Sequence, residues 1–599
     1  MKQVFCMLIL FLCFIPVLSG GNVNDDILPP APEWNGESRN LVVADDDPWI
    51  TPFEVSGLTR SPSYDETMAW LRKLVDSAPE LEMVSIGQSL EGREIFMVIA
   101  SADGRFSPGM PARKPVMLAH AGIHSGEIDG KDAGMMLLRD MTVGKRKQLL
   151  LAGVDFLFIP ILSVDGHELA SAYNRINQRG PEVMGWRTNS RNLNLNRDFG
   201  KLETRGVQAL VGVLNDWQPD LYLDLHVTDG KDGQYDITFG FNTGDAYSPA
   251  TSAWLTEHFR PRLDKELESM GHIPGPFFFT RDRLDITKGL VNFQASIRFS
   301  NGYGDARHIP TILVENHSLK PFDQRVLGTY VFMEGALKLL AESSADLGKA
   351  VASDKALRPS EVPVSWKPRE KESSWAFKGI DFEVIDSEIA GGKVVRWLGK
   401  PKTFELSYLE MDVARQTVPI PKGYWVPSTW PEIIEKLEMH GIAMTRLEEA
   451  REVDVQMIRL VDPKLDQSGY EGKVRMRAEL KPEDMKYRFP KGSVYVPTDQ
   501  PLGKLAAVLL EPGSPDGFFQ WGYFPEILQR TEYFEMYVGE PLARKMLAEN
   551  PELEAEFKKK VAEDADFAGD SRARLHWFYE RSHYMDPRWR LYPIGRDVN

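Results

Sequence analysis

Residues 221–226 read Leu-Tyr-Leu-Asp-Leu-His, an apolar run that ends on a histidine. Short apolar runs bounded by turns are typical of strands buried in a sheet. Segments with helical apolar spacing lie on either side of this run, at Val207–Trp217 and near Ser252–Met270. Strands that alternate with helices favour a parallel sheet covered on both faces. The sequence therefore predicts an α/β fold with a mixed, mostly parallel sheet and helices on both faces.

The same alternation extends from about residue 51 to residue 345, which we expect to form one domain. Its other predicted elements are the strands Met83–Ile86, Ile95–Ala100, Pro115–Ala119, Phe156–Leu162 and Thr311–Val314 and the helices Tyr64–Val75, Met135–Met141 and Val331–Ala345.

The remainder of the chain differs in character. Residues 20–50 and 346–376 are polar and rich in proline or charge, so we expect two linkers there. Beyond them, residues 377–599 are predicted to form a β-rich or α+β accessory domain with a helical, charged stretch over 533–586. A chain of 599 residues exceeds what one hydrophobic core usually supports, so two or three domains are expected.

Composition excludes several classes of protein. Apolar residues make up 42% of the chain and charged residues 26%, which is ordinary for a globular protein and argues against extensive disorder. The formal net charge is -16, whereas phosphate binding needs a basic face. We therefore expect no nucleic-acid partner.

The first residues have the pattern of a secretory signal peptide. Lys2 precedes an apolar run over Val4–Val17, and cleavage is predicted after Ser19. The alternative is an uncleaved membrane anchor, for which the run is short. Both cysteines, Cys6 and Cys13, lie inside this segment. The predicted mature chain, secreted or periplasmic, thus has no disulfide and no thiolate ligand, so histidine and carboxylate must hold any metal.

Two segments together suggest a metal site. His124-Ser-Gly-Glu127 follows one predicted strand, and His226 ends the strand quoted above. Two imidazoles and a carboxylate hold Zn²⁺ and leave a fourth position for water. In open α/β sheets, sites gather at the carboxyl ends of strands. Taken alone, the first motif can arise by chance, and His226 can be a core histidine bonded to a carboxylate.

Two further segments carry charged groups of interest. Glu315 ends the apolar strand Thr311–Val314, where it is either a general base or the partner of an arginine in a salt bridge. The loop from Arg187 to Phe199 contains Asn196 and Arg197, and guanidinium groups bind carboxylates in a planar, bidentate way. A solvated basic loop is the alternative.

Together these segments resemble the zinc carboxypeptidase family, which includes carboxypeptidases A and B and bacterial peptidoglycan peptidases. The resemblance covers roughly residues 55–345. It implies one zinc ion held by His124, Glu127 and His226 and a general base at Glu315. It places an oxyanion-stabilising arginine at Arg187 and a pair that binds the substrate carboxylate at Asn196 and Arg197.

The chain departs from the family pattern at two places. Asn194 stands where the family usually has an aspartate that supports a zinc histidine, so a lower zinc affinity is expected. The family's substrate-contacting tyrosine usually lies further upstream of the base than Tyr303, which is assigned that role here.

The sequence as a whole predicts a zinc metallocarboxypeptidase that hydrolyses C-terminal peptide bonds with Glu315 as base. Its partner would be a peptide or protein with a free C-terminus. One alternative is a catalytically degenerate peptidase fold that only binds. Another is a zinc-dependent deacylase or amidase of small N-acyl amino acids or cell-wall peptides.

Overall fold

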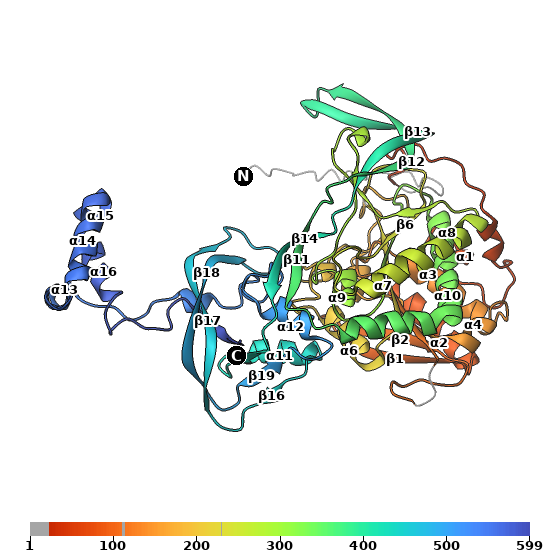
Figure 1. Ribbon diagram of the computed structural model, residues 1–599. Helices are drawn as coiled ribbons and strands as arrows, with labels where there is room; N and C mark the ends of the chain where they lie inside the picture. Colours follow the sequence, from red (N-terminus) through yellow and green to blue (C-terminus); the bar gives the residue numbers. More distant parts are fainter. Residues whose placement is uncertain (1–22, 111–113, 229, 599) are drawn as a thin grey trace, which may run out of the picture. The chain divides into compact units, whose positions relative to one another are not determined.

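The computed structural model describes residues 23–110, 114–228 and 230–598 (Figure 1). The predicted signal peptide, residues 1–19, lies outside the described residues. The chain folds into two compact units. The first contains the described residues up to 355 together with residues 367–413, and the second contains residues 356–366 and 414–598.

The first unit is built on an eight-stranded sheet. Its strands are β1 (Leu81–Gln88), β2 (Glu94–Ala100), β3 (Val116–Ala121), β4 (Asp155–Ile159), β5 (Leu221–Val227), β6 (Ile237–Gly240), β7 (Pro274–Pro276) and β10 (Thr311–Asn316). They lie in the order β1-β2-β4-β3-β5-β10-β6-β7. The central strands β4, β3, β5 and β10 are parallel, whereas β1, β2 and β6 pair antiparallel with their neighbours towards the centre. The predicted mixed, mostly parallel sheet is confirmed.

Helices cover both faces of this sheet. Leu225 of β5 lies against Gly130 of helix α3 (Asp129–Met141), where a Cβ would come within 2.6 Å of the leucine side chain. Asp224 points to the opposite face, since successive strand residues alternate, and contacts Ser300 at the start of helix α9 (Ser300–Ala306). Every residue of β5 is buried as a result. The two faces explain why the run 221–226 is apolar on one side and polar on the other.

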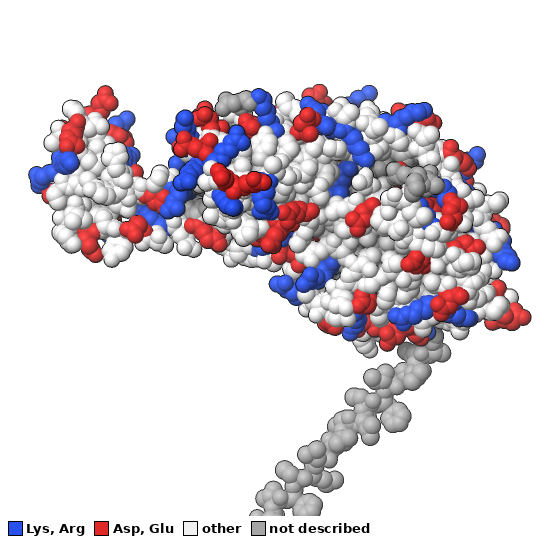
Figure 2. Space-filling view, turned by 90° about the horizontal axis from the view of Figure 1, so that it is seen from below, with Lys and Arg blue, Asp and Glu red and all other residues white. Residues whose placement is uncertain are grey.

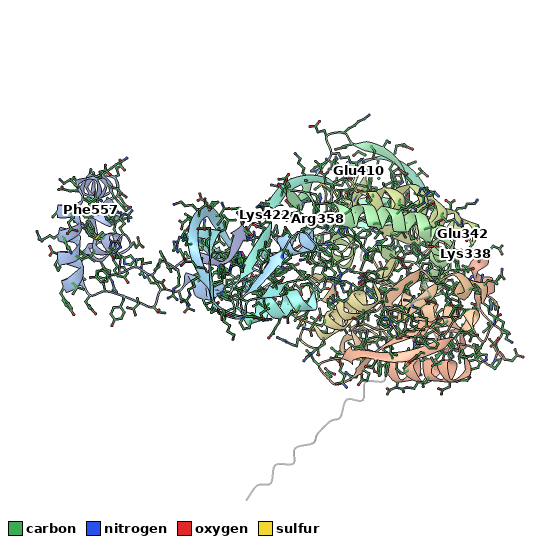
Figure 3. All side chains as sticks on the ribbon, turned by 60° about the horizontal axis from the view of Figure 1, so that its bottom comes forward. Lys338, Glu342, Arg358, Glu410, Lys422 and Phe557 are labelled. Atoms are coloured by element: carbon green, nitrogen blue, oxygen red, sulfur yellow. The ribbon has the colours of Figure 1, made fainter. Side chains whose placement is uncertain are left out.

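A single long helix, α10 (Phe322–Ala356), fills much of the remaining core. Its residues are buried almost continuously from Phe322 to Leu340, which is typical of a helix surrounded by protein. Beyond Leu340 many of its side chains are exposed, and Glu342, which is labelled in Figure 3, is one of them. The predicted helix Val331–Ala345 is thus correct in place but too short at both ends.

A smaller sheet adds to the first unit. It joins β8 (Phe279–Thr280) and β9 (Leu290–Val291) to the long hairpin of β12 (Ser373–Ser387) and β13 (Gly392–Leu409). The hairpin extends from the body of the unit in Figure 1. Its base is anchored by a buried apolar cluster of Tyr235, Ile286, Leu290, Phe377 and Leu406.

Both predicted linkers are wrong in the parts that the structure describes. Residues 23–50 pack on the first unit, where Ser38 is fully buried and hydrogen-bonded to His272 at 2.8 Å. In 346–376, α10 continues to Ala356, and β11 (Glu361–Lys367) and the start of β12 follow. The hairpin therefore belongs to the first unit, although the sequence placed it in an accessory domain from residue 377. The charge and proline content of these segments did not reveal the contacts, because the contacts are made with residues that are far away in the sequence.

The second unit has its own six-stranded sheet and a helical segment. The sheet contains β15 (Gly423–Val426), β16 (Thr445–Arg446), β17 (Arg451–Leu465), β18 (Met476–Phe489), β19 (Val494–Pro497) and β20 (Leu591–Asp597). Helices α13 (Met536–Glu549), α14 (Pro551–Glu563), α15 (Ala565–Gly569) and α16 (Ser571–Tyr579) share an apolar cluster that includes Phe557, which is labelled in Figure 3. The predicted β-rich region with a helical stretch near 533–586 is confirmed.

Charges are distributed without a dominant sign on the face seen in Figure 2. Acidic and basic side chains are interspersed there. This face therefore has no broad field of one sign that would attract a strongly charged partner.

Candidate metal and active site

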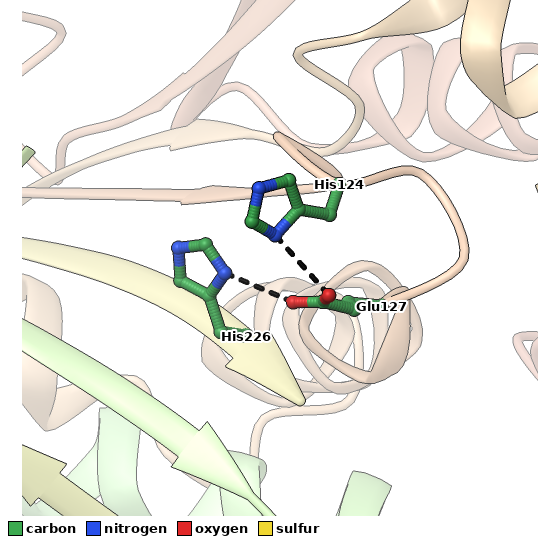
Figure 4. A group of neighbouring side chains, drawn as sticks. All are labelled: His124, Glu127 and His226. Carbon is green, nitrogen blue, oxygen red and sulfur yellow. Dashed lines mark hydrogen bonds and ion pairs between the residues drawn. The ribbon is translucent and has the colours of Figure 1, made fainter. Parts of the chain in front are cut away.

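Three side chains from distant segments meet at the carboxyl ends of β3 and β5 (Figure 4). His124 and Glu127 lie on the turn between β3 and α3, and His226 lies near the end of β5. His124 Nδ1 is 3.1 Å from Glu127 Oε1, and His226 Nδ1 is 2.9 Å from Glu127 Oε2. All three are buried, and one ligand atom of each lies within 4.8 Å of the others.

The outward nitrogen of each imidazole has an acceptor that fixes its tautomer. Asn194 Oδ1 accepts from the backbone N–H of Asn196 at 2.9 Å, so this oxygen is an acceptor, and His124 Nε2 at 2.9 Å must donate to it. His226 Nε2 lies 2.7 Å from Asp224 Oδ2 and donates to it. Both Nδ1 atoms thereby face Glu127.

This donor set fits Zn²⁺. Two neutral imidazoles and a carboxylate are the ligands of a catalytic zinc site with one open position. Burial lowers the pKa of His124, which favours the neutral ligand form. Burial also lowers the pKa of His226, but Asp224 and Glu127 outweigh it and raise this pKa well above the usual value. A metal ligand must be a neutral imidazole, so zinc and a proton compete for His226.

Glu127 is ionised despite its burial. Burial alone would raise its pKa, but the neighbouring His124 and Arg175 and a hydrogen bond from His226 hold the pKa well below the usual value. Arg175 Nη1 and Arg187 Nη1 lie 2.8 and 2.9 Å from Glu127 Oε1. The sequence predicted a role for Arg187 only. Arg175 reaches the site across Gly126, where a Cβ would be 2.6 Å from the arginine Cγ, and no local pattern indicates this approach.

Glu315 occupies the strand position beside His226. β5 and β10 are parallel, and Glu315 is the register partner of His226, so the two side chains point to the same face of the sheet. Glu315 also lines the same cavity as His124, Glu127 and His226. The structure thus brings the predicted base next to the predicted metal ligands.

Asn196 and Arg197 follow Asn194 on the short turn Leu195–Arg197. Asn196 Oδ1 accepts from the backbone N–H of Ser300 at 2.9 Å, and Arg197 donates to the backbone oxygen of Asn196 at 2.7 Å. The Arg197 guanidinium lies 4.4 Å from the centroid of the Phe299 ring. Both residues line the cavity.

Tyr303 is the exception among the predicted site residues. Its side chain is fully buried, its hydroxyl accepts a hydrogen bond from Arg307 at 3.1 Å, and its ring packs on Phe199 at 5.4 Å. Among the described residues that line the cavity, Tyr303 does not appear. The structure does not bring Tyr303 to the substrate, because α9 turns its side chain into the core.

A cavity of about 650 Å³ opens beside the candidate ligands, a size typical of small-ligand sites. Aromatic rings supply much of its wall, and their edge-to-face contacts run from Phe299 to Phe293 at 4.9 Å and on to Phe279 at 5.8 Å. The aromatic lining residues are Tyr235, Phe277, Phe278, Phe279, Phe293, Phe299 and Trp397.

Trp397 comes from the β12–β13 hairpin and was assigned no role from the sequence. It is the register partner of Phe382, and their rings are 5.5 Å apart. Residues 398–400 bulge opposite a single residue of β12, with Gly399 at a φ of +67°, which favours glycine. Bulges re-aim neighbouring side chains. This one adjoins the tryptophan that reaches the cavity wall.

Residues 67–227 match the family model described as zinc carboxypeptidase. This segment is similar to the zinc carboxypeptidase family. It contains His124, Glu127 and His226, together with the basic loop that includes Arg187 and Arg197. The match and the curated relatives support a zinc metallocarboxypeptidase, a hydrolase of peptide bonds.

Curated relatives align with most of the length of this chain. Carboxypeptidase 2 of Trichophyton rubrum is 22% identical over 492 residues, which cover 78% of this chain and 85% of that protein. Carboxypeptidase 2 of Trichophyton tonsurans is 21% identical over 500 residues, covering 80% and 87%. These alignments are longer than the family match, so they include sequence beyond the catalytic segment.

Solved structures that resemble the chain include a metallo-carboxypeptidase from Pseudomonas aeruginosa, with 18% identity and a TM-score of 0.36. The aligned region covers 48% of this chain and 70% of the Pseudomonas aeruginosa chain. Carboxypeptidase A from Helicoverpa armigera has 18% identity and a TM-score of 0.35, covering 49% and 74%. Separately, no helix in the part of the chain that the structure describes has the length and apolar character to cross a membrane.

Proposed function

We propose that the first unit is a secreted or periplasmic zinc carboxypeptidase that removes single residues from the free carboxyl terminus of a peptide. The observation that carries the proposal is the convergence on one cavity of three groups of side chains. These are a two-histidine, one-carboxylate donor set, a carboxylate on the neighbouring strand, and two guanidinium groups.

One zinc ion is held, in this proposal, by His124, His226 and Glu127. When bound, it polarises the scissile carbonyl and lowers the pKa of a water molecule. Glu315 takes the proton from the attacking water and passes it to the leaving amine. Arg187 donates hydrogen bonds to the oxyanion that forms at the carbonyl oxygen.

Specificity for the chain terminus comes from Asn196 and Arg197. A guanidinium and an amide side by side suit the two oxygens of a terminal carboxylate. This pair favours an exopeptidase over an endopeptidase, because an internal peptide bond offers no such anion. Export is supported by the predicted signal peptide, and the substrate is either a protein or a cell-wall peptide.

Digestion of a peptide library, read by mass spectrometry, tests this function. We expect single C-terminal residues to be lost, a zinc chelator to stop the loss, and added zinc to restore it. Amidation of the terminus removes the anion and should slow cleavage by about 10- to 100-fold, because hydrogen bonds to a charged group contribute roughly 1.5–3 kcal/mol. Zinc binding without turnover of any peptide would instead favour the degenerate, binding-only alternative.

The aromatic wall also predicts which terminal residue is preferred. Phe299 packs against Arg197, so the side chain next to a bound carboxylate meets phenyl rings. The carboxylates among the described lining residues are Glu127 and Glu315, both of which have catalytic roles in this proposal. We expect a C-terminal phenylalanine to be favoured over arginine by about 10- to 100-fold in kcat/KM, since burial of a large apolar side chain contributes about 1.5–3 kcal/mol.

Three N-acyl dipeptides that differ only in a terminal Phe, Arg or Glu measure this preference. The glutamate substrate controls for attraction to Lys231, which also lines the cavity. Equal kcat/KM values for Phe and Arg would show that the aromatic wall does not select the terminal side chain.

A further inference from the structure

Asp224 is a fully buried carboxylate directly behind the candidate metal site. It lies two residues before His226 on β5, so both side chains point to the same face of the sheet. Its Oδ2 accepts from His226 Nε2 at 2.7 Å and from the hydroxyl of Ser300. The amide nitrogen of Asn196 lies 3.5 Å from the same oxygen.

The other oxygen faces a second buried pair. Asp224 Oδ1 lies 3.2 Å from His120 Nε2, and that nitrogen is also 2.7 Å from the hydroxyl of Tyr222. A buried carboxylate is costly unless hydrogen bonds compensate its lost hydration. The contacts of Oδ2 with His226 on β5 and with Ser300 at the start of α9 compensate part of this cost and fix the position of Asp224.

The two candidate zinc histidines therefore have different partners. His124 donates to the neutral amide oxygen of Asn194 at 2.9 Å, whereas His226 donates to the charged oxygen of Asp224 at 2.7 Å. A carboxylate behind a ligating imidazole fixes its orientation and strengthens it as a ligand, and an amide does so without charge. The charged support lies behind His226.

The same carboxylate also reaches the substrate-binding side of the cavity. Ser300 donates its hydroxyl to Asp224 and its backbone N–H to Asn196 Oδ1 at 2.9 Å. Asn196 immediately precedes Arg197, whose guanidinium lines the cavity. Asp224 and Ser300 together hold the amide of Asn196 from both of its ends.

We propose that Asp224 is a positioning residue that couples the two halves of the site. It holds the imidazole of His226 for the metal, and through Ser300 it holds Asn196 for the terminal carboxylate of the substrate. The second part rests on the proposed carboxypeptidase function. The first part concerns metal binding alone.

Zinc affinity, measured by competition with a chromophoric chelator, tests whether Asp224 supports His226 as a metal ligand. Asp224→Asn keeps the shape of the side chain and removes its charge, so we expect zinc to bind about 10- to 100-fold more weakly. Asp354→Asn is the matched control. It removes a buried carboxylate that accepts from the backbone N–H groups of Ala250 and Thr251 and contacts none of the candidate ligands, and its zinc affinity should stay within about twofold of the parent. Equal zinc affinities in the two variants would overturn the proposal.

Ser300→Ala tests whether Asp224 supports Asn196 through Ser300. It removes only one hydroxyl group, so this variant can be measured even if Asp224→Asn does not fold. We expect KM for an N-acyl dipeptide to rise severalfold, kcat to change little, and zinc affinity to stay within about twofold of the parent. An unchanged KM would refute the link to Asn196. If the parent protein binds zinc but cleaves no peptide, the chelator assay still decides the metal half, so the two proposals fail separately.

Discussion

Replacement of Glu315 by glutamine is expected to lower kcat by about 10²- to 10⁴-fold while zinc remains bound. Glutamine has nearly the same shape, but its amide cannot take a proton from water. Glu315 is the register partner of His226, so the substitution changes a group next to the metal ligands without removing one. Steady-state kinetics on an N-acyl dipeptide and elemental analysis of the purified variant measure the two quantities.

Glu342→Gln provides the matched control for this substitution. Glu342 lies on the exposed part of α10 and pairs with Arg262 at 2.8 Å, so the same chemical change there should leave kcat unaltered. If Glu315→Gln retains more than about a tenth of the parent kcat, Glu315 is not the general base.

The largest expected loss of stability follows from Arg325→Met. Arg325 is fully buried and holds Asp129 through two contacts of 2.9 and 3.2 Å. It also donates to the backbone oxygens of Arg179 and Lys320, both at 2.6 Å. Removing it leaves a buried carboxylate and several carbonyls without this donor, which should lower the free energy of unfolding by about 3–5 kcal/mol.

Hydrogen exchange at the amides of β5 and β10 measures this loss within the first unit. Arg262→Met is the control, because its side chain is partly exposed and pairs with glutamates at the surface, where such pairs contribute about 0–1 kcal/mol. A loss below about 1 kcal/mol for Arg325→Met would contradict the argument. Asp129 opens α3 two residues after Glu127, so this pair also anchors the turn that carries two candidate ligands.

Local patterns predicted the elements that carry the site. The apolar run of β5 and the strand before Glu315 form neighbouring parallel strands, as their burial on both faces requires. The predicted metal ligands also converge, since strand ends of a parallel sheet meet at one edge. The strands could be predicted because periodicity is a property of short segments.

Other parts of the site could not be predicted, because they depend on contacts between distant segments. Tyr303 lies close to Glu315 in the sequence, yet α9 turns it into the core. Trp397 reaches the cavity from a hairpin that the sequence placed in another domain. Arg175 contacts Glu127 only because Gly126 leaves room for it.

The amino-acid sequence by itself determined the residue types of the candidate metal site, their place at strand ends and the α/β class, because these follow from local patterning and ligand chemistry. The tertiary structure decided which groups support those residues: a carboxylate behind His226, an amide behind His124 and an aromatic wall around the cavity. The reason is physical. Burial, orientation and hydrogen-bond partners are set by side chains far away in the chain, and no short segment contains that information.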